Sequence, residues 1–398
     1  MLSDESRAKR SVHEFQRLPL DERLVVFHAE VREDWVDLGR LVHRLTVAQN
    51  RPVAYLTSDL DDPLLQRPQP NLHAYYVGRG RTRKRLFRQL RANVVVVSRP
   101  SIGRDLPRSK ECDIHYALIL GGLQSVSTTH SEATLRGYGT IFCSGPHQTE
   151  ELRDCLGDDV HVLELGNARV DAILERRRRY PDEVDSFHTP SVLVAPDTAE
   201  FFRRGGTDIV ERLLLAGFRV TVHLAPGFPN GDKTARQLEK QLGIIPGLLV
   251  HRAPATPSLL FSSQLVVTDW SDLALQYALG MERPVVFIDV PRTDRRAAGT
   301  VRRRPIEVAL RDRLGRIVDT EKLPDIARIC DRVMRGGTPD AESLERLRSQ
   351  VVYHASLSGA IGSAAIEALT LQHDPEAALQ RALNELTKRD EPKRWDAA

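Results

Sequence analysis

Short runs of apolar, often β-branched residues recur along the whole chain, and this repetition limits the fold more than any other feature. Near-continuous runs of this kind are typical of strands buried on both faces of a parallel sheet. The runs lie at Leu24–Phe27, Val53–Leu56, Val94–Val97, Tyr116–Leu120, Thr140–Ser144 and Val162–Leu165, and then at Val192–Ala195, Phe218–Leu224, Leu248–His251, Leu265–Thr268 and Val285–Ile288.

The segments between these runs have the spacing of helices. A helix is predicted from about Thr207 to LLLAG, where Gly217 ends it, and a final helix begins at Asp374-Pro375. Strand and helix therefore alternate, which predicts a doubly wound α/β fold with right-handed crossovers. The residues that share one helical face after the first strand are Trp35, Leu38, Val42 and Leu45.

Length and composition divide this pattern between two domains. A chain of 398 residues exceeds what one core usually holds, and its composition changes at ERRRRYPDEVDSFHTP, which is charged and has no apolar periodicity. The arginine run there is interpreted as a solvated helix end or, alternatively, as a binding patch. We predict an N-terminal Rossmann-like domain over residues 1–175, a linker over 176–190, a C-terminal Rossmann-like domain over 191–372, and a helix and tail over 373–398.

Charge and hydropathy indicate the compartment. The formal net charge of +3 does not favour nucleic-acid binding by the whole molecule. The start MLSDESRAKRSVHEF lacks the apolar core of a signal peptide, and no stretch approaches the roughly 20 apolar residues that cross a bilayer. No CxxC pair occurs, so reduced thiols are expected. We predict a cytoplasmic protein, in one interpretation peripheral on the inner membrane face.

One segment joins a buried strand to a helix start that suits phosphate. In VVTDWSDLALQYALGMERPVVFID the strand ends at Thr268, and a helix runs from about Ser271 to near Gly280. Ligands of open α/β sheets bind at the carboxyl ends of strands, and a helix N-terminus there presents free N–H groups. The hydroxyl groups of Thr268 and Ser271 add hydrogen-bond donors for a phosphate. A simple capped helix is the alternative.

This segment resembles the TDxSS and following motif of the CDP-glycerol glycerophosphotransferases of bacterial wall and capsule synthesis. The likeness continues in order over most of the chain, from about Leu24 to Arg335. The other similar segments are LVVFHAE, AYLTSDLDDPLL, YGTIFCSGPHQTEELR, GNARVD, SVLVAP and RPIEVALRDRLG. The resemblance implies the GT-B arrangement, in which two Rossmann-like domains face one cleft. It also implies a donor pyrophosphate near Thr268, Asp269 and Ser271.

The chain departs from this family at the histidines. The family's proposed base and its second histidine correspond to Gly121, or Gly122 with a one-residue shift, and to Ala225. Losing a general base typically costs about 10²–10⁴-fold in rate. The substitutes we weigh are His130 and His223, each against a structural role. The last serine of the motif is Asp272, whose carboxylate would repel a phosphate.

A basic segment, RGRTRKRLFRQLR, carries an apolar stripe of Leu86, Phe87 and Leu90. Such a helix is able to lie on anionic lipid, where the resemblance places a lipid-linked acceptor. The alternative is a surface helix that covers the sheet with its arginines in water. No aromatic interleaving supports nucleic acid as a partner. The basic residues concerned are Arg79, Arg81, Arg83, Lys84, Arg85, Arg88 and Arg91.

The resemblance implies a transferase that moves a polyol phosphate from a CDP-linked donor to a hydroxyl acceptor in teichoic acid and other cell-envelope polymer synthesis. The acceptor hydroxyl attacks the donor phosphorus and CMP leaves. The sequence demands no cofactor and has no metal motif such as HExxH. Two alternatives stay open: a non-catalytic relative that binds a nucleotide, glycan or partner protein, and a glycosyltransferase that uses a nucleotide sugar.

Overall fold

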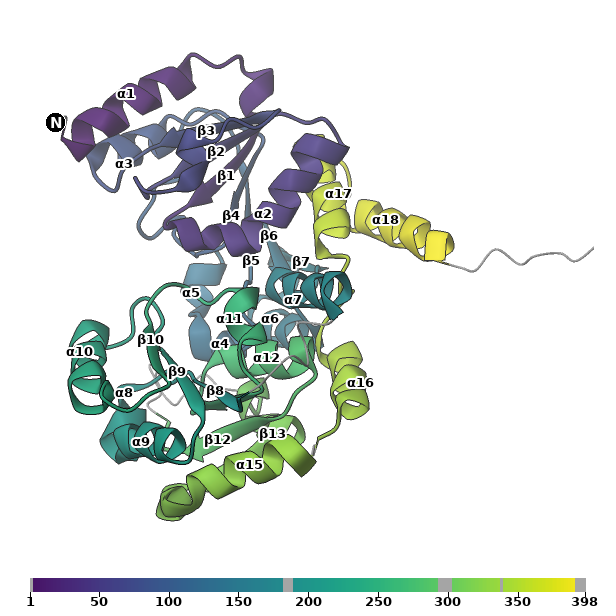
Figure 1. Ribbon diagram of the computed structural model, residues 1–398. Helices are drawn as coiled ribbons and strands as arrows, with labels where there is room; N and C mark the ends of the chain where they lie inside the picture. The colour runs from purple at the N-terminus through teal and green to yellow at the C-terminus, as the bar shows by residue number, and fades with distance from the viewer. Residues whose placement is uncertain (1–2, 182–188, 293–302, 337–338, 391–398) are drawn as a thin grey trace, which may run out of the picture. The chain divides into compact units, whose positions relative to one another are not determined.

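The protein is described by a computed structural model that covers residues 3–181, 189–292, 303–336 and 339–390 (Figure 1). The centre of the predicted linker therefore lies outside the described residues. The chain forms two compact units, each around a parallel sheet of its own. This confirms the α/β class with two Rossmann-like sheets. The first unit comprises residues 1–121, 130–168 and 353–398, and the second comprises 122–129 and 169–352.

The first unit holds a seven-stranded sheet in the order β3-β2-β1-β4-β5-β6-β7, with every pair parallel. The chain adds strands on one side of β1 and then crosses to begin again with β4. The carboxyl ends of β1 and β4 are therefore the topological switch point, where such sheets bind ligands. The strands are β1 (Val25–Ala29), β2 (Val53–Thr57), β3 (Leu72–Tyr76), β4 (Val94–Val97), β5 (His115–Ile119), β6 (Thr140–Cys143) and β7 (His161–Glu164).

Helices cover both faces of this sheet. One face packs against α2 and the C-terminal helices through a buried core that includes Phe27, Leu38 and Val96. The other face meets α3, where Phe87 lies edge-on to the His28 ring, and α1 packs beside α3 (Figure 1). The helices of this unit are α1 (Asp4–Gln16), α2 (Trp35–His43), α3 (Arg81–Arg88), α5 (Glu132–Leu135), α6 (Pro146–Leu156), α17 (Ser358–Thr370) and α18 (Pro375–Asp390).

The C-terminal helices return to the first unit, unlike the predicted division at residue 372. Ile361 and Ile366 of α17 are fully buried in the same core as Phe27. Gly362 permits this close approach, since a Cβ there would overlap the Leu41 side chain. The sequence shows that α17 has an apolar face, but it does not show which sheet that face packs against. The cause is physical, because a helix crossing back to an earlier sheet leaves no local signal.

The second unit holds a six-stranded parallel sheet in the order β10-β9-β8-β11-β12-β13. Alternate residues of its strands face two separate cores, so both faces are again buried. The strands are β8 (Ser191–Val194), β9 (Arg219–His223), β10 (Leu248–His251), β11 (Leu265–Thr268), β12 (Val285–Asp289) and β13 (Gly315–Asp319).

The two helices of the second unit whose bounds were predicted, α9 and α12, begin and end close to the predicted places. Gly217 follows α9 with a φ of +85°, a left-handed value that suits glycine. The helices are α4 (Val126–Thr129), α7 (Ala168–Arg179), α8 (Ala199–Phe201), α9 (Thr207–Leu215), α10 (Gly231–Leu242), α11 (Pro257–Phe261), α12 (Asp272–Met281), α13 (Ile306–Ala309), α14 (Arg311–Leu314), α15 (Ile326–Gly336) and α16 (Ala341–Val351).

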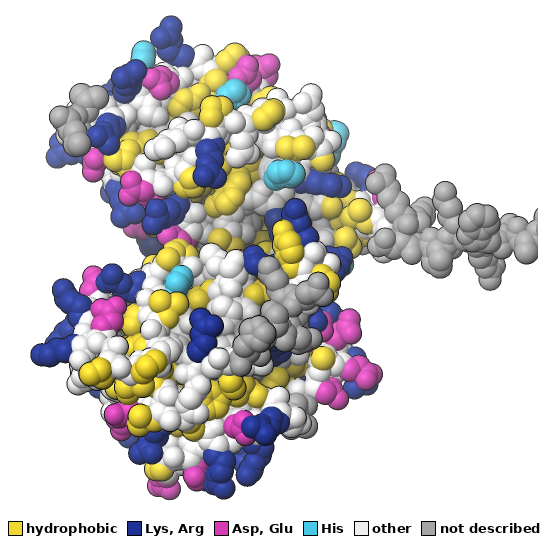
Figure 2. Space-filling view, viewed as in Figure 1, with side chains coloured by type: hydrophobic (Ala, Val, Ile, Leu, Met, Phe, Trp, Pro, Cys, Tyr) yellow, Lys and Arg dark blue, Asp and Glu magenta, His cyan; other side chains and the backbone are white. Residues whose placement is uncertain are grey.

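The predicted arginine run is the last turn of α7. It is more than a solvated helix end, because Arg177 forms an ion pair with Glu282 at 2.7 Å and Arg176 donates to Ser258 Oγ at 2.8 Å. Figure 2 shows basic side chains interspersed with acidic ones over the visible surface of both units. The visible surface therefore carries mixed charge.

The burial of α17 predicts which unit its mutation will destabilise. Ile366→Ala removes a fully buried side chain from the first core, which should cost about 2–5 kcal/mol. Hydrogen exchange should show faster exchange in β1–β7 and unchanged exchange in β8–β13. The matched control is Leu371→Ala, at a side chain that is 45% exposed. Loss of protection in the second sheet instead would contradict the observed division.

Candidate functional site

The predicted strand, turn and helix are present at the carboxyl end of the second sheet. β11 ends at Thr268, and α12 begins at Asp272 with Ser271 as its N-cap. Ser271 Oγ accepts a hydrogen bond from the Leu273 N–H at 3.2 Å. The helix ends at Met281, and the next residue, Glu282, has a left-handed φ of +56°.

Two of the predicted phosphate ligands are occupied by the protein itself. Thr268 and Asp269 are fully buried. Thr268 Oγ1 donates to the Ala195 carbonyl at 2.6 Å. The Asp269 carboxylate accepts from the Asp197 N–H at 2.7 Å and from the Thr198 N–H and hydroxyl at 3.0 and 2.6 Å. In this structure both side chains fix the loop that follows β8, and of the three predicted ligands only Ser271 lies at the helix start with partial exposure.

Asp272 anchors a segment of chain onto the start of α12. One carboxylate oxygen accepts from the Leu123 N–H at 2.8 Å, and Gln276 donates to the other. Nearby, Gln124 Nε2 donates to the Trp270 carbonyl at 2.8 Å. Burial raises the pKa of Asp272, and attraction to Arg169 only partly offsets this rise. The half-buried Asp272 side chain thus helps to hold the segment 122–129 in the second unit.

A second carboxylate, the buried Glu307 of α13, holds the same segment. It accepts from the Ser125 N–H at 3.0 Å and from the Thr128 hydroxyl at 2.8 Å. Arg292 also forms an ion pair with it at 2.6 Å. Glu307 was not among the predicted site residues. Its position inside the otherwise apolar run PIEVAL could have indicated a buried carboxylate.

Two guanidinium groups gather on the Trp270 ring, at the carboxyl ends of β11 and β12. The guanidinium carbon of Arg311 lies 4.0 Å from the ring centroid, and that of Arg292 lies 5.6 Å away. Arg311 is buried and forms an ion pair with Asp289 at 2.9 Å. These contacts place two positively charged side chains beside the start of α12. From the sequence, the helix N-terminus was the only source of positive charge considered there.

The predicted substitute His223 is paired with a histidine that the sequence analysis missed. Its Nδ1 lies 3.1 Å from Nδ1 of His251, across the neighbouring carboxyl ends of β9 and β10. Burial, and then repulsion from His251, lowers the pKa of His223 to about 4. His223 is therefore neutral at pH 7, and the pair must share one Nδ1 proton.

The first unit places a carboxylate where the family would have its histidine. A Cβ on Gly121 would overlap the Asp37 carboxylate, and Asp37 is buried on α2. The Gly121 carbonyl accepts from Asn167 Nδ2 at 3.0 Å. Glycine is required here because a side chain of its own would displace Asp37. His130, the other predicted substitute, is half-buried directly after α4, and its role stays a prediction.

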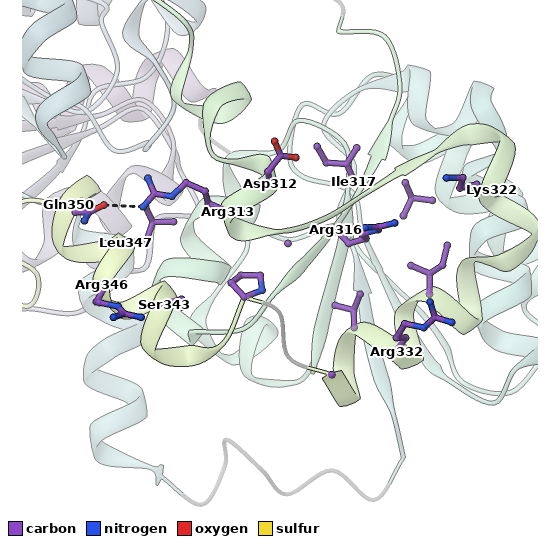
Figure 3. Close-up of a pocket in the computed structure, with 16 residues that line it drawn as sticks. Asp312, Arg313, Arg316, Ile317, Lys322, Arg332, Ser343, Arg346, Leu347 and Gln350 are labelled. Carbon is purple, nitrogen blue, oxygen red and sulfur yellow. Dashed lines mark hydrogen bonds between the residues drawn. The ribbon is translucent and has the colours of Figure 1, made fainter.

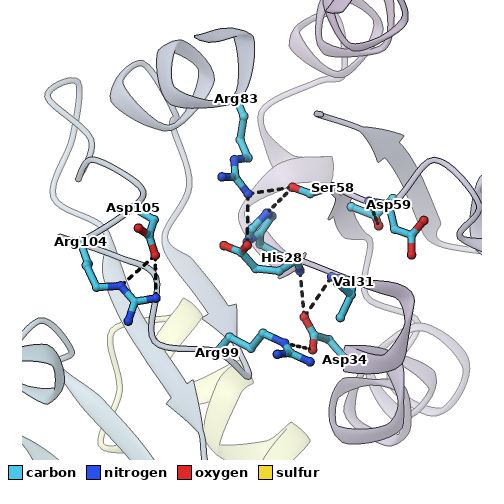
Figure 4. A network of polar contacts seen from close by, with 11 residues as sticks. His28, Val31, Asp34, Ser58, Asp59, Arg83, Arg99, Arg104 and Asp105 are labelled. Carbon is cyan, nitrogen blue, oxygen red and sulfur yellow. Dashed lines mark hydrogen bonds and ion pairs between the residues drawn. The ribbon is translucent and has the colours of Figure 1, made fainter. Parts of the chain in front are cut away.

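A polar network lies at the switch point of the first sheet (Figure 4). Ser58 Oγ lies 3.2 Å from His28 Nε2 and accepts from Arg83 at 3.1 Å. Arg83 also pairs with Glu30 at 3.4 Å. Burial, and then repulsion from Arg83, lowers the pKa of His28 to about 3. Among the described residues, His28 Nδ1, Glu30 Oε1 and Arg83 Nε are buried without a hydrogen-bond partner.

Arg83 is therefore a correction to the predicted basic surface. Its side chain is 7% exposed and points into the network, so it cannot contact a membrane. The predicted apolar stripe of α3 is buried as well, with Leu86 and Phe87 at 2% and 0% exposure. The helix covers the sheet, as the alternative interpretation proposed, and Leu90 is buried just after it.

The remaining cations of α3 border a groove of about 840 Å³ against α1. The groove is rich in basic side chains, and Glu5 is the acidic residue that lines it. Glu5 is occupied, because it accepts from the Thr82 N–H and hydroxyl at the start of α3. The basic residues that line the groove are Lys9, His13, Arg81, Lys84, Arg85 and Arg88.

Comparison with known proteins gives the fold a precedent. Two solved structures of the wall teichoic acid polymerase TagF match nearly the whole chain. One, soaked with CDPG, has a TM-score of 0.58 at 12% identity, and the match covers 92% of this chain and 94% of the chain in that structure. The other has a TM-score of 0.57 at 13% identity, with coverage of 97% and 95%. The chain shares its fold with TagF.

The same fold occurs in a Listeria monocytogenes protein described as a UDP-N-acetylglucosamine 2-epimerase. Its TM-score is 0.55 at 14% identity, covering 88% of this chain and 97% of that one. No family model and no curated protein matches the sequence. These comparisons confirm the GT-B type fold that the sequence resemblance implies.

No helix in the described part of the chain combines the length and the hydrophobicity that crossing a bilayer requires.

The buried His223 predicts a pH dependence for the second unit. Its pKa of about 4 lies below the ordinary value of 6.5, so the unfolded state binds the proton more readily. The stability from neutral His223 is complete above about pH 6.5 and is lost as the pH falls toward 4, by about 3 kcal/mol in total. His223→Gln should flatten this dependence in hydrogen exchange of β8–β11, whereas the exposed His13→Gln should not. An unchanged slope in His223→Gln would contradict the assignment.

Proposed function

We propose that the chain is a transferase that moves a polyol phosphate from a CDP-linked donor to a hydroxyl acceptor in cell-surface polymer synthesis. The observation that carries the proposal is the fold likeness to TagF, a wall teichoic acid polymerase, over both units at once. The ordered sequence resemblance to the glycerophosphotransferases supports it. The epimerase with the same fold supports the coarser statement that a nucleotide-activated substrate is used.

The donor would bind at the carboxyl end of the second sheet. Ser271 and the first turn of α12 offer a hydroxyl group and the positive end of a helix. Arg292 and Arg311, stacked on Trp270, add two guanidinium groups that suit phosphate oxygens. In the proposed reaction an acceptor oxygen bonds to the donor phosphorus, the bond from phosphorus to the CMP oxygen breaks, and the acceptor proton passes to a base.

Asp37 is our proposed base in the first unit, in place of the missing histidine. Its carboxylate occupies the space at Gly121 to which the family resemblance assigns that role. The network of His28, Ser58 and Arg83 at the same carboxyl edge would help to hold the acceptor. It offers both donors and acceptors, and the Arg83 charge is balanced by Glu30, which suits hydroxyl groups better than a second phosphate.

A non-catalytic relative that binds a nucleotide or glycan is the second candidate. It is favoured by the occupation of Thr268, Asp269 and Asp272 with internal hydrogen bonds. A sugar transferase that uses a nucleotide sugar is the third. Turnover and binding separate the three, because only the first releases CMP from CDP-glycerol with an acceptor present.

Turnover with CDP-glycerol tests the proposal directly. CMP release should appear with a glycerol phosphate acceptor and should fall about 10²-fold or more in Asp37→Asn, since a positioned base contributes at that level. The exposed Asp61→Asn is the matched control and should keep full turnover. Melting temperatures of both variants show whether the fold is intact.

Three outcomes of this assay would count against the proposal. Release of UDP from a UDP-sugar, with none of CMP, would favour the sugar transferase. Calorimetric binding of CDP-glycerol without turnover would favour the non-catalytic relative. Full turnover in a folded Asp37→Asn would remove Asp37 from the mechanism.

The groove between α1 and α3 is proposed to hold the protein at the inner membrane face, close to a lipid-linked acceptor. Arg81, Lys84 and Arg85 are exposed there, and each basic residue near an anionic surface contributes about 1 kcal/mol. Arg81→Glu combined with Arg85→Glu should abolish sedimentation with phosphatidylglycerol vesicles at low salt. Arg236→Glu, exposed on α10, should leave it unchanged. Equal binding by both would contradict the proposal.

A further inference from the structure

A groove of about 930 Å³ runs along the edge of the second sheet, away from the start of α12 (Figure 3). Its floor is β13, which pairs only with β12 among the described strands. One wall is α15 and the other is α16. The residues that supply these surfaces include Gly315–Val318 from the strand, Ile329 and Val333 from α15, and Ser343 and Leu347 from α16.

The groove carries a strong excess of positive charge. Among the described residues that line it, Asp312 is the one acidic residue, whereas the basic residues are Arg313, Arg316, Lys322, Arg332 and Arg346. Arg313 donates to Gln350 Oε1 at 3.0 Å, and Arg346 lies 3.6 Å from the exposed Glu342. The side chains of Arg316, Lys322 and Arg332 make no hydrogen bond or ion pair with the described parts of the chain, and all three are exposed.

The cations are spread along the groove instead of converging on one point. Figure 3 shows Arg313 and Arg346 at one end, Arg316 beside the strand, and Lys322 and Arg332 at the other end. A single phosphate group would need its donors to converge. A line of separated cations suits a ligand whose negative charges are separated in the same way.

The edge of β13 adds a second requirement. An edge strand presents N–H and C=O groups that no neighbouring strand satisfies, and it is a template for another extended chain. The half-buried Ile317 and Val333 give apolar surface between the cations. A peptide that adds a strand gains affinity from its main-chain hydrogen bonds and specificity from alternate side chains.

We propose that this groove binds an acidic, extended segment of a partner protein, which adds a seventh strand beside β13. Acidic side chains of the segment face Arg316 and Arg332 on the α15 side of the sheet, and the alternate apolar side chains lie against Ile317 on the α16 side. The complex is electrostatically steered, so it forms faster and more tightly at low salt. This inference is independent of the proposed transferase chemistry.

Binding of a synthetic peptide to the full chain tests the proposal. The probe is a short peptide that alternates glutamate and valine, and it should bind in fluorescence anisotropy with an affinity that falls as salt rises. A peptide that alternates lysine and valine should not bind. Arg316→Glu combined with Arg332→Glu should weaken the glutamate peptide about tenfold or more, since each exposed ion pair contributes modestly and is here replaced by a repulsion.

Two controls separate strand addition from general attraction to negative charge. Arg335→Glu makes the same charge change on α15, at a residue that pairs with Asp331 and does not line the groove, and it should bind as the unmodified chain does. A glutamate–valine peptide N-methylated at alternate residues keeps its charge but loses main-chain donors, so it should bind much more weakly.

The proposal is overturned by any of three results. The first is no binding of the glutamate peptide at millimolar concentration. The second is equal weakening by Arg335→Glu and by the groove variant. The third is binding of the N-methylated peptide, or of phosphatidylglycerol vesicles, with the same dependence on Arg316 and Arg332 as the unmethylated peptide, which would make the groove a site for anions in general.

Discussion

A parallel sheet must be covered on both faces, and this requirement organises both units. In the second unit, alternate residues of β8, β11 and β12 enter two cores, and helices on each side close them. In the first unit the local helices do not complete the cover. The chain therefore returns after residue 352, and α17 fills the face beside α2. The first strands and the C-terminal helices thus share one core although the sequence separates them by the second unit.

A structural feature could be predicted when the residues that determine it lie close together in the sequence. The doubly buried strands were predicted correctly because their pattern is local, but β3 and β13 were missed. Both are edge strands with partly exposed residues, so they lack a continuous apolar run. The packing of α17 on the first sheet was missed because it depends on residues far away in the sequence. Arg83 was counted among the cations of the membrane interpretation because spacing along a helix does not show that an arginine can turn inward to Ser58 and Glu30.

In the candidate site, too, the features set by neighbouring residues could be predicted, and the contacts with residues far away in the sequence could not. The cap at Ser271 and the start of α12 were predictable, because capping is a local property. The partners of Asp269 and Asp272 were not, since they come from the loop after β8 and from Leu123. A motif that resembles a phosphate site in sequence can therefore spend much of its hydrogen-bonding capacity on its own fold, and Glu307 adds a second buried carboxylate to the same region.

The charges around α12 decide how an anionic donor could still be held there. Burial raises the pKa of Asp272, and a carboxyl group that keeps its proton more readily repels phosphate less. A helix dipole contributes about 0.3–1 kcal/mol, whereas a hydrogen bond to a charged group contributes about 1.5–3 kcal/mol. In the proposed donor site the guanidinium groups on Trp270, which also pair with Glu307 and Asp289, would therefore contribute more to holding phosphate than the helix end. An acidic residue at the start of α12 is compatible with the proposed donor site for this reason.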